Sequence, residues 1–378
     1  MTIDEYKQAV QCIVYLCGCV VNEEKPDTNR ISSCLDDLYK AAQSHMLTVI
    51  VATALEMVGI ISDKFTQAKV KAIRKTLLLE TERLKVEDEF ERNNIWYLNL
   101  KGRLIGECYP DYSMRQMSDV DICVNHEKVD EVCDIMKNNG FQVKSYGIGV
   151  HDIYYKEPVY NFEIHRELFG MEYNEKFRQY YADPLKYAVR DKNKGCGYSF
   201  MPEDSYVYMM THIFKHFSSG GTGLKSLLDC YVFGKKHVED INWDYINSKL
   251  THLGIDVFEK RFRTLSRCVF SDLALTESQK EMLDYLIFSG AYGSMRNRVY
   301  NKINEMGRFR YLLSRIFLPF DMLAEQYPIL RTVPIVMPVC VIFRLINGYI
   351  YKRDLFMFQI KAVLGIDDRK NNKSVISC

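Results

Sequence analysis

The 378-residue sequence predicts an α+β protein in which a small mixed β-sheet lies between N-terminal and C-terminal helical domains. Three observations lead to this prediction. Apolar residues recur at helical spacing through residues 1–92. Residues 93–200 instead contain short runs of large apolar residues bounded by Gly and Pro, which is typical of strands. From residue 201 onward the helical pattern returns.

The N-terminal helical region, residues 1–92, ends in a long charged stretch at 67–93, whose charges are most simply a solvated face. After it we expect a strand-rich core. Its predicted elements are a strand at 95–100, a short helix at 104–108, a strand at 119–124, a helix at 128–138 and strands at 141–145, 153–156 and 159–165. This order describes a mixed sheet backed by helices.

The C-terminal half divides into a helical domain, 201–315, and an apolar helical segment with a tail, 316–378. The most apolar run, residues 333–343, contains two prolines and is too short to span a bilayer. We expect it to be buried, with a contact to a membrane surface as the alternative, and we expect the tail from Asp367 to be frayed. Helices are predicted over 204–217, 224–235, 243–266, 277–288 and 300–313.

The composition is that of an ordinary folded protein, with 47% hydrophobic and 26% charged residues. A formal net charge of +1 argues mildly against a large RNA surface and gives no reason to expect DNA as a partner. The 12 cysteines are scattered and include no zinc pattern, so reduced thiols are expected. The first residues lack the basic stretch of a signal peptide, and we expect a cytoplasmic protein.

Two aspartates, Asp119 and Asp121, stand one residue apart in the strand-rich core. On a strand they project from one face, where they repel each other unless a cation lies between them. Mg²⁺ is a common solution because it prefers carboxylate oxygens. In the strand 159–165, Glu163 and His165 would share a face. If the two strands are neighbours, Glu163 completes a three-carboxylate cluster able to hold two metals for a phosphoryl-type transfer.

Rival interpretations of the acid pair can be tested on the sequence. A calcium EF-hand fails because Cys123 and Val124 occupy the fifth and sixth loop positions, which need an oxygen ligand and Gly. Two exposed acids on an edge strand remain the alternative. Farther along, the Gly-rich stretch before Lys225 fails the P-loop pattern because Leu224 precedes the lysine.

Several polar residues of the C-terminal half are candidates for the same cleft. Lys225 and Asp229 lie four apart on a predicted helix, so both could reach the cleft, with Lys225 touching phosphate. His212 and His216 share that spacing but lack the Glu of a zinc H-E-x-x-H motif. They are expected to be structural or to line an acceptor pocket. His165 would orient Glu163, contact substrate or serve the structure.

Four short motifs follow one another around the acids: Leu100-Lys101-Gly102, Tyr109-Pro110, Arg115-Gln116-Met117-Ser118-Asp119-Val120-Asp121 and Glu163-Ile164-His165. Together they resemble the catalytic core of the DNA polymerase β-type nucleotidyltransferase superfamily, and in particular its bacterial branch known as the uncharacterised nucleotidyltransferase family. The motif match covers about residues 97–168. One departure is that the usual Gly-Ser of the phosphate turn is Gly102-Arg103 here.

The resemblance implies a metal-dependent enzyme that moves a nucleoside monophosphate from an NTP to an acceptor hydroxyl or phosphate and releases pyrophosphate. Two Mg²⁺ ions are implied, with Mn²⁺ able to substitute, held by Asp119, Asp121 and Glu163 as the catalytic residues. The acceptor is expected to be a small molecule. Nucleotidylation of RNA or protein, or a non-catalytic nucleotide sensor, are the alternatives.

The same resemblance, together with the spacing of the later residues, gives two further sets of candidates. The nucleotide-binding residues would be Lys101, Gly102, Arg103, Arg115, Ser118 and Lys225, and the acceptor-pocket residues His165, His212, His216 and Asp229. The oligomeric state is not indicated by the sequence.

Overall fold

The computed structural model describes residues 1–170 and 173–365, apart from the side chains of Arg103, Asp321 and Glu325. The predicted tail from Asp367 lies outside these residues. The chain divides into two compact units. The first comprises Met1–Lys215 and Gly223–Ala291, and the second comprises His216–Thr222 and the C-terminal part from Tyr292.

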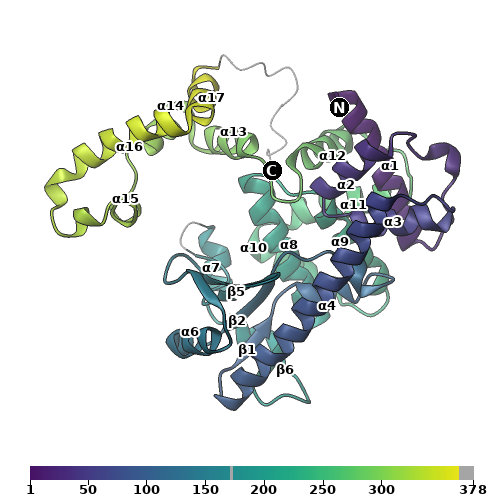
Figure 1. Ribbon diagram of the computed structural model, residues 1–378, viewed down its shortest axis with the longest axis horizontal. Helices are drawn as coiled ribbons and strands as arrows, with labels where there is room; N and C mark the ends of the chain where they lie inside the picture. Colours follow the sequence, from purple (N-terminus) through teal and green to yellow (C-terminus); the bar gives the residue numbers. More distant parts are fainter. Residues whose placement is uncertain (171–172, 366–378) are drawn as a thin grey trace. The chain divides into compact units, whose positions relative to one another are not determined.

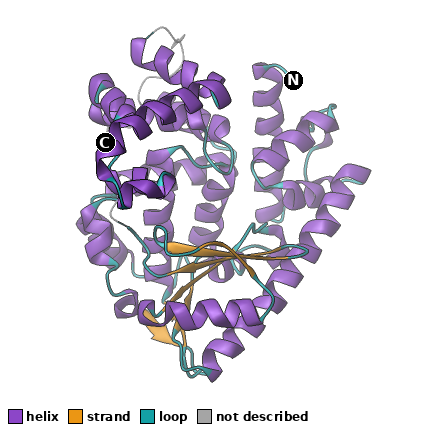
Figure 2. Ribbon diagram, turned by 60° about the vertical axis from the view of Figure 1, so that its left-hand side comes forward, coloured by secondary structure: helices purple, strands orange, loops and turns teal. Residues whose placement is uncertain are grey.

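A mixed sheet occupies the centre of the first unit, and within the described residues it has seven strands in the order β3-β4-β5-β2-β1-β7-β6 (Figure 2). The central strand β2 pairs in parallel with β5 and antiparallel with β1, which itself pairs in parallel with β7. The strands are β1 (Tyr97–Asn99), β2 (Val120–Val124), β3 (Gln142–Ser145), β4 (His151–Lys156), β5 (Tyr160–His165), β6 (Ala188–Arg190) and β7 (Gly197–Phe200). The predicted α+β class, with helical regions on both sides of a mixed sheet, is confirmed.

Strands β6 and β7 were not among the predicted elements. They are three and four residues long, and neither carries the repeated apolar alternation that marked the other strands. They form a hairpin whose β7 extends the sheet beyond β1, where Tyr97 pairs with Gly197. A side chain on Gly197 would meet the Tyr97 hydroxyl at 2.8 Å, so the close approach requires glycine.

In the sequence, helices precede and follow the strand-rich segment of the first unit. The first helix begins with a capping box in which Thr2 and Glu5 satisfy each other's backbone N–H groups. The predicted helix 243–266 is two helices, because Gly254 adopts a φ of 74° and ends the first. The helices are α1 (Ile3–Val21), α2 (Leu35–Ser44), α3 (Thr48–Met57), α4 (Asp63–Arg92), α5 (Gly102–Gly106), α6 (Val129–Asn138), α7 (Glu175–Tyr180), α8 (Pro202–Ser219), α9 (Leu224–Lys236), α10 (Trp243–Leu253), α11 (Asp256–Phe270) and α12 (Glu277–Ser289).

One face of the sheet packs on α4 and α6 and forms a hydrophobic core (Figure 1). Ile122 of β2 and Ile164 of β5 are paired across the two strands and are fully buried there. They pack with Phe90 from α4 and Met136 from α6. Because side chains alternate along a strand, the residues next to these isoleucines project from the opposite face.

The second unit is helical in its described part. The predicted helix 300–313 is broken at Gly307, whose φ of 81° separates two helices. Ala362 packs with Tyr300 and Tyr311 in one small core, and Leu330 packs with Cys340 and Val341 in another. The helices are α13 (Met295–Met306), α14 (Arg308–Ile316), α15 (Phe320–Gln326), α16 (Met337–Tyr351) and α17 (Arg353–Leu364).

The expectation that the apolar, proline-containing run is buried is wrong. Only 11% of the 18 residues of Pro334–Tyr351 are buried. The reason is that α16 packs through one side only, where Cys340 and Val341 join the small core. By length and composition alone this stretch is the one candidate membrane span among the described residues, which is weak evidence for a spanning helix.

The core predicts a large effect for one buried aromatic residue. Phe162 of β5 is fully buried and packs edge-to-face on Phe141 at a centroid distance of 5.1 Å. We expect Phe162→Ala to lower the free energy of unfolding by about 3–5 kcal/mol, measured by urea denaturation followed by circular dichroism. Leu77→Ala, at a 63% exposed position of α4, should change it by less than about 0.5 kcal/mol. Equal effects would contradict the assignment of the core.

Candidate active site

The parallel pairing of β2 with β5 places two acids side by side on the face opposite the hydrophobic core. Asp121 and Glu163 are register partners in the two central strands. The backbone N–H of Leu100 donates to the Asp121 carbonyl oxygen at 3.1 Å, which brings the end of β1 to the same point. Asp119 directly precedes β2. The fold thus gathers the three predicted catalytic carboxyls at adjoining strands.

Lys101 neutralises part of this negative charge. It follows β1 with a positive φ of 48°, and its Nζ lies 3.3 Å from Asp121 Oδ2. The same Nζ lies 2.9 Å from Nε2 of His212 on α8. Gly102 begins α5, where an added Cβ would approach the Met117 sulfur at 3.2 Å. The Lys101-Gly102 turn therefore presents its amine directly to the acids.

Two histidines lie against the acids from the neighbouring strands β4 and β5. His165 Nε2 is 3.0 Å from Asp121 Oδ1 and 3.9 Å from Glu163 Oε2. His151 Nε2 is 3.6 Å from the same Glu163 oxygen. The ligand atoms of His151, Glu163 and His165 all lie within 4.8 Å of one another, so these three residues could hold a metal ion.

The pKa values of the three carboxyl groups are shifted in different directions. Burial, followed by the negative charges of Asp121 and Asp119, raises the pKa of Glu163 to about 7. Burial and the charge of Asp121 also raise the pKa of Asp119. Burial and the nearby His165 lower the pKa of His151 to about 4, so His151 is neutral at pH 7.

Asp121 behaves in the opposite way. Its burial would raise its pKa, but the positive charge of Lys101 and the hydrogen bond to His165 outweigh the burial and lower the pKa below its usual range. Asp121 is therefore ionised while its two neighbours resist ionisation. Three carboxyl groups thus meet at one point, and carboxylate oxygens are the ligands that a divalent cation such as Mg²⁺ prefers.

Arg115 and Asp229, predicted to contact nucleotide and acceptor, contact each other. Arg115 Nε and Nη2 each donate to one carboxylate oxygen of Asp229 at 3.0 Å, in a bidentate pair. The Tyr109 hydroxyl donates to the same carboxylate at 2.7 Å. Both members of the pair are buried. The pair joins the segment before β2 to α9, and thereby fixes where β2 begins.

Two further predicted residues lie near Asp119. Burial and the charge of Arg115 lower the pKa of Lys225 to about 8, although Asp229 and Asp119 act in the opposite direction. The backbone oxygen of Ser118 accepts a hydrogen bond from Lys75 Nζ at 3.0 Å. His216 belongs to the second unit, and the side chain of Arg103 lies outside the described residues. Their predicted roles remain predictions.

Two cations near the acids were not predicted. Lys75 lies on α4, where the run of charges indicated only a solvated face, but Asp119 acts on its pKa. Lys215 on α8 is close enough to Glu163 to oppose the rise of that carboxyl's pKa. The i, i+3 spacing of Lys215 from His212 on α8 was the signal available in the sequence.

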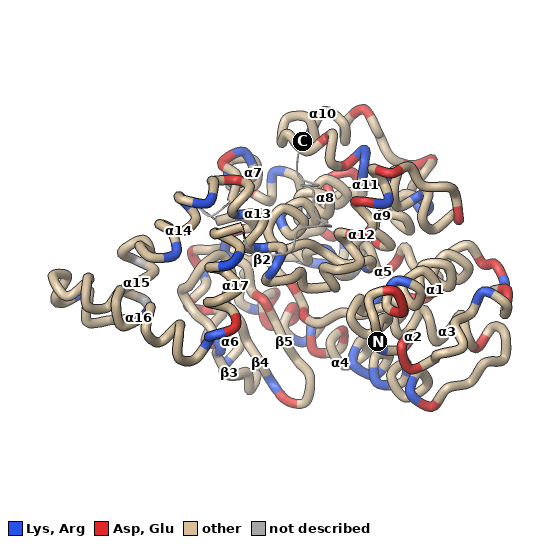
Figure 3. The backbone as a smooth tube through the Cα atoms, turned by 90° about the horizontal axis from the view of Figure 1, so that it is seen from above, with Lys and Arg blue, Asp and Glu red and all other residues tan. Residues whose placement is uncertain are grey.

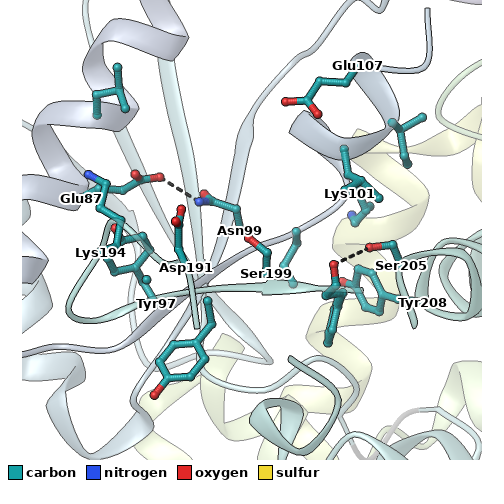
Figure 4. A pocket seen from close by; sticks show the side chains of 17 residues that line it. Glu87, Tyr97, Asn99, Lys101, Glu107, Asp191, Lys194, Ser199, Ser205 and Tyr208 are labelled. Atoms are coloured by element: carbon teal, nitrogen blue, oxygen red, sulfur yellow. Dashed lines mark hydrogen bonds between the residues drawn. The ribbon is translucent and has the colours of Figure 1, made fainter. Parts of the chain in front are cut away.

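A pocket of about 250 Å³ begins beside Lys101. It is formed by β1, the start of α5, β7 and the start of α8, and the lining that the structure describes includes none of the four predicted acceptor-pocket residues. Polar groups occur at both ends (Figure 4). Lys101, Ser205 and Tyr208 lie toward one end, and Glu87, Asn99, Asp191 and Lys194 lie toward the other.

Acids gathered on two adjacent strands beside a lysine turn are suited to phosphoryl-type transfer. The sequence model of a family described as "Uncharacterised nucleotidyltransferase" matches residues 33–271, which include the sheet and every predicted catalytic residue. The chain belongs to this family of nucleotidyltransferases and is thereby a transferase. Comparisons with curated proteins and with solved structures gave no match.

The raised pKa of Glu163 predicts a pH dependence of stability. Between pH 4.5 and about 7 the unfolded chain loses this proton while the folded protein keeps it, so ionisation costs stability as the pH rises. In chelator-treated protein, Glu163→Gln should gain stability relative to wild type between pH 5 and pH 8, by up to about 3 kcal/mol. Urea denaturation at each pH measures the difference.

Glu127→Gln, a change at an exposed position after β2, is the matched control and should show no such gain. A constant difference between Glu163→Gln and wild type across this pH range would contradict the raised pKa.

Proposed function

We propose that this protein transfers a nucleoside monophosphate from an NTP to an acceptor hydroxyl or phosphate, with two Mg²⁺ ions at Asp119, Asp121 and Glu163. The observation that carries the proposal is the pairing of Asp121 with Glu163 on adjacent strands. The Lys101 amine lies 3.3 Å from Asp121 Oδ2. The family match supports nucleotidyl transfer as the reaction.

The residues present fit the proposed ions. Carboxylate oxygens are the preferred ligands of Mg²⁺, and burial, followed by the charge of Asp121, raises the pKa values of Asp119 and Glu163. When bound, the ions would lower the pKa of the acceptor and neutralise the leaving pyrophosphate, and Mn²⁺ would serve in place of Mg²⁺. His151 and His165 lie close enough to Glu163 to orient it or to join it as ligands.

The reaction is an in-line displacement at the α-phosphorus. The acceptor oxygen forms a bond to this phosphorus as the bond to the pyrophosphate oxygen breaks, and pyrophosphate leaves. For an acceptor hydroxyl, we assign receipt of the proton to Glu163, the carboxyl that pairs with Asp121 on the neighbouring strand. His165 holds Asp121 in place through its 3.0 Å contact.

Lys101 has a second role in this scheme. Its amine pairs with Asp121 and His212 in the protein alone. If the carboxylates held the proposed ions, this amine would be the group of the Lys101-Gly102 turn that contacts the triphosphate. Lys225, whose lowered pKa reflects burial near other cations, is a further phosphate contact. Arg115 acts by holding Asp229 and thereby the start of β2.

A small molecule is the acceptor that we propose. The pocket beside Lys101 is not part of this proposal, because its described lining includes none of Asp119, Asp121 and Glu163. Incubation of the protein with labelled NTP and cell extract tests this assignment. Label should enter the small-molecule fraction and survive nuclease and protease. Label in RNA or in protein would instead support the alternative acceptors.

The metal assignment predicts loss of activity without loss of fold. Asp121→Asn should reduce pyrophosphate release by at least about a hundredfold, because it removes a charge that the transition state requires. Asp134→Asn, at an exposed position of α6, should leave turnover unchanged. Circular dichroism should show both variants folded. Wild-type turnover in Asp121→Asn would contradict the proposal.

The role given to Lys101 predicts an effect on substrate binding. Lys101→Met should raise the KM for NTP by about tenfold, since a hydrogen bond to a charged group contributes about 1.5–3 kcal/mol. Lys71→Met, at an exposed position of α4, is the matched control and should leave KM unchanged. Steady-state kinetics with varied NTP measure both. An unchanged KM in Lys101→Met would remove Lys101 from the nucleotide site.

A further inference from the structure

Helix α16 of the second unit exposes a stripe of apolar side chains. The packed side carries Cys340 and Val341, whereas Ile342 is 59% exposed and Ile346 is 49% exposed. A helix that faces water normally carries polar residues at such positions. The exposed stripe has the spacing i, i+3, i+4, i+7, i+10 and i+11, and consists of Val339, Ile342, Phe343, Ile346, Tyr349 and Ile350.

Helix α14 repeats this arrangement. Its packed side is held by Tyr311, which is buried against α13 and α17. Phe309 is 72% exposed and Phe317, directly after the helix, is 60% exposed. With Leu312 and Leu313 between them, these residues form a second exposed apolar stripe at helical spacing. The second unit therefore presents two apolar faces to its surroundings.

The charges around these stripes have one predominant sign. Residues 308–365 contain eight Lys and Arg but three Asp and Glu, although the whole chain has a net charge of only +1. The tube of α16 carries almost no charged residue along its length (Figure 3). At its end, Tyr349 and Tyr351 are followed by Lys352 and Arg353. Apolar faces bordered by tyrosine and basic residues are typical of segments that lie in a membrane interface.

A groove of about 250 Å³ lies among α14, α16 and α17 and adds a second observation. Its lining is mostly aliphatic and aromatic, it includes Arg315, Arg344 and Lys352, and its described lining residues include no Asp or Glu. Arg344 Nη2 donates to the Ile316 carbonyl oxygen at 3.0 Å, but its buried Nε has no partner among the described residues. An apolar groove with cations fits an acyl chain attached to a phosphate.

We propose that helices α14–α17 bind the surface of a membrane that contains anionic phospholipid, with the exposed stripes in the interface and one phospholipid in the groove. The 18 residues of Pro334–Tyr351 extend about 27 Å as a helix, slightly less than a hydrocarbon core of about 30 Å, and Arg344 would lie near the middle of a spanning helix, where a charge is costly. Arg344 ties one side of α16 to the end of α14. The helix therefore lies in the plane of the interface and does not cross the bilayer.

Vesicle flotation of the full chain tests this proposal. Wild-type protein should float with vesicles of phosphatidylcholine mixed with phosphatidylglycerol, bind vesicles of phosphatidylcholine alone more weakly, and lose binding as salt is added. The double variant Ile342→Ser with Ile346→Ser should bind at least about tenfold more weakly. Lys352→Ala and Arg353→Ala should each weaken binding to the anionic vesicles by about fivefold.

Leu77→Ser on α4 is the matched control, because Leu77 is as exposed as the two isoleucines but lies in the first unit. It should bind vesicles as wild type does. The proposal is overturned if wild-type protein does not float with anionic vesicles, or if Leu77→Ser loses as much binding as the double variant. It is also overturned if wild-type protein does not float and light scattering finds a dimer that the double variant separates, since the stripes would then be a self-association surface.

Discussion

The side-by-side placement of Asp121 and Glu163 is the constraint on which the rest of the candidate active site depends. Parallel pairing of β2 with β5 makes them register partners, so the backbones that carry the two acids are held side by side at the centre of the sheet. Two neighbouring negative charges on a partly buried face need nearby positive charge or hydrogen bonds. Lys101 at 3.3 Å and His165 at 3.0 Å supply it at Asp121.

Asp121 receives more of this compensation than Glu163 does, so the two carboxyl groups ionise at different pH. Lys101 and His165 keep Asp121 ionised, whereas the pKa of Glu163 rises to about 7. Under the proposed mechanism, the three carboxylates would hold the ions, and the Lys101 amine would contact the triphosphate. The buried pair of Arg115 with Asp229 fixes the backbone that precedes the acids.

The sequence alone predicted the features of the fold that depend on local periodicity. Alternation along the strands predicted that Asp121 would project from one face and that Glu163 would share a face with His165. In the structure Asp121 and Glu163 are register partners, and Val120 and Ile122 belong to the core on the other face. The sequence did not predict β6 and β7, because strands this short have no periodic pattern. Their place in the sheet comes from pairing with β1.

Sequence patterns did not predict contacts between residues that are far apart in the sequence. Arg115 and Asp229 lie 114 positions apart, and nothing local indicates that they pair. The charges of α4, Lys75 included, were assigned to a solvated face, because periodicity does not show which residues of a long helix lie near a site. In the structure Lys75 donates to the Ser118 carbonyl oxygen. The apolar stretch of α16 was expected to be buried, since hydrophobicity alone does not tell a core helix from one that faces outward.

Binding of Mn²⁺ to the protein with a non-hydrolysable NTP, followed by electron paramagnetic resonance, tests the central claim most directly. The account predicts that wild-type protein binds Mn²⁺ at the acids, that Mg²⁺ displaces it, and that the double variant Asp119→Asn with Asp121→Asn no longer binds it although it remains folded. Equal Mn²⁺ binding by wild type and by this variant would contradict the account, because the metals would then lie elsewhere.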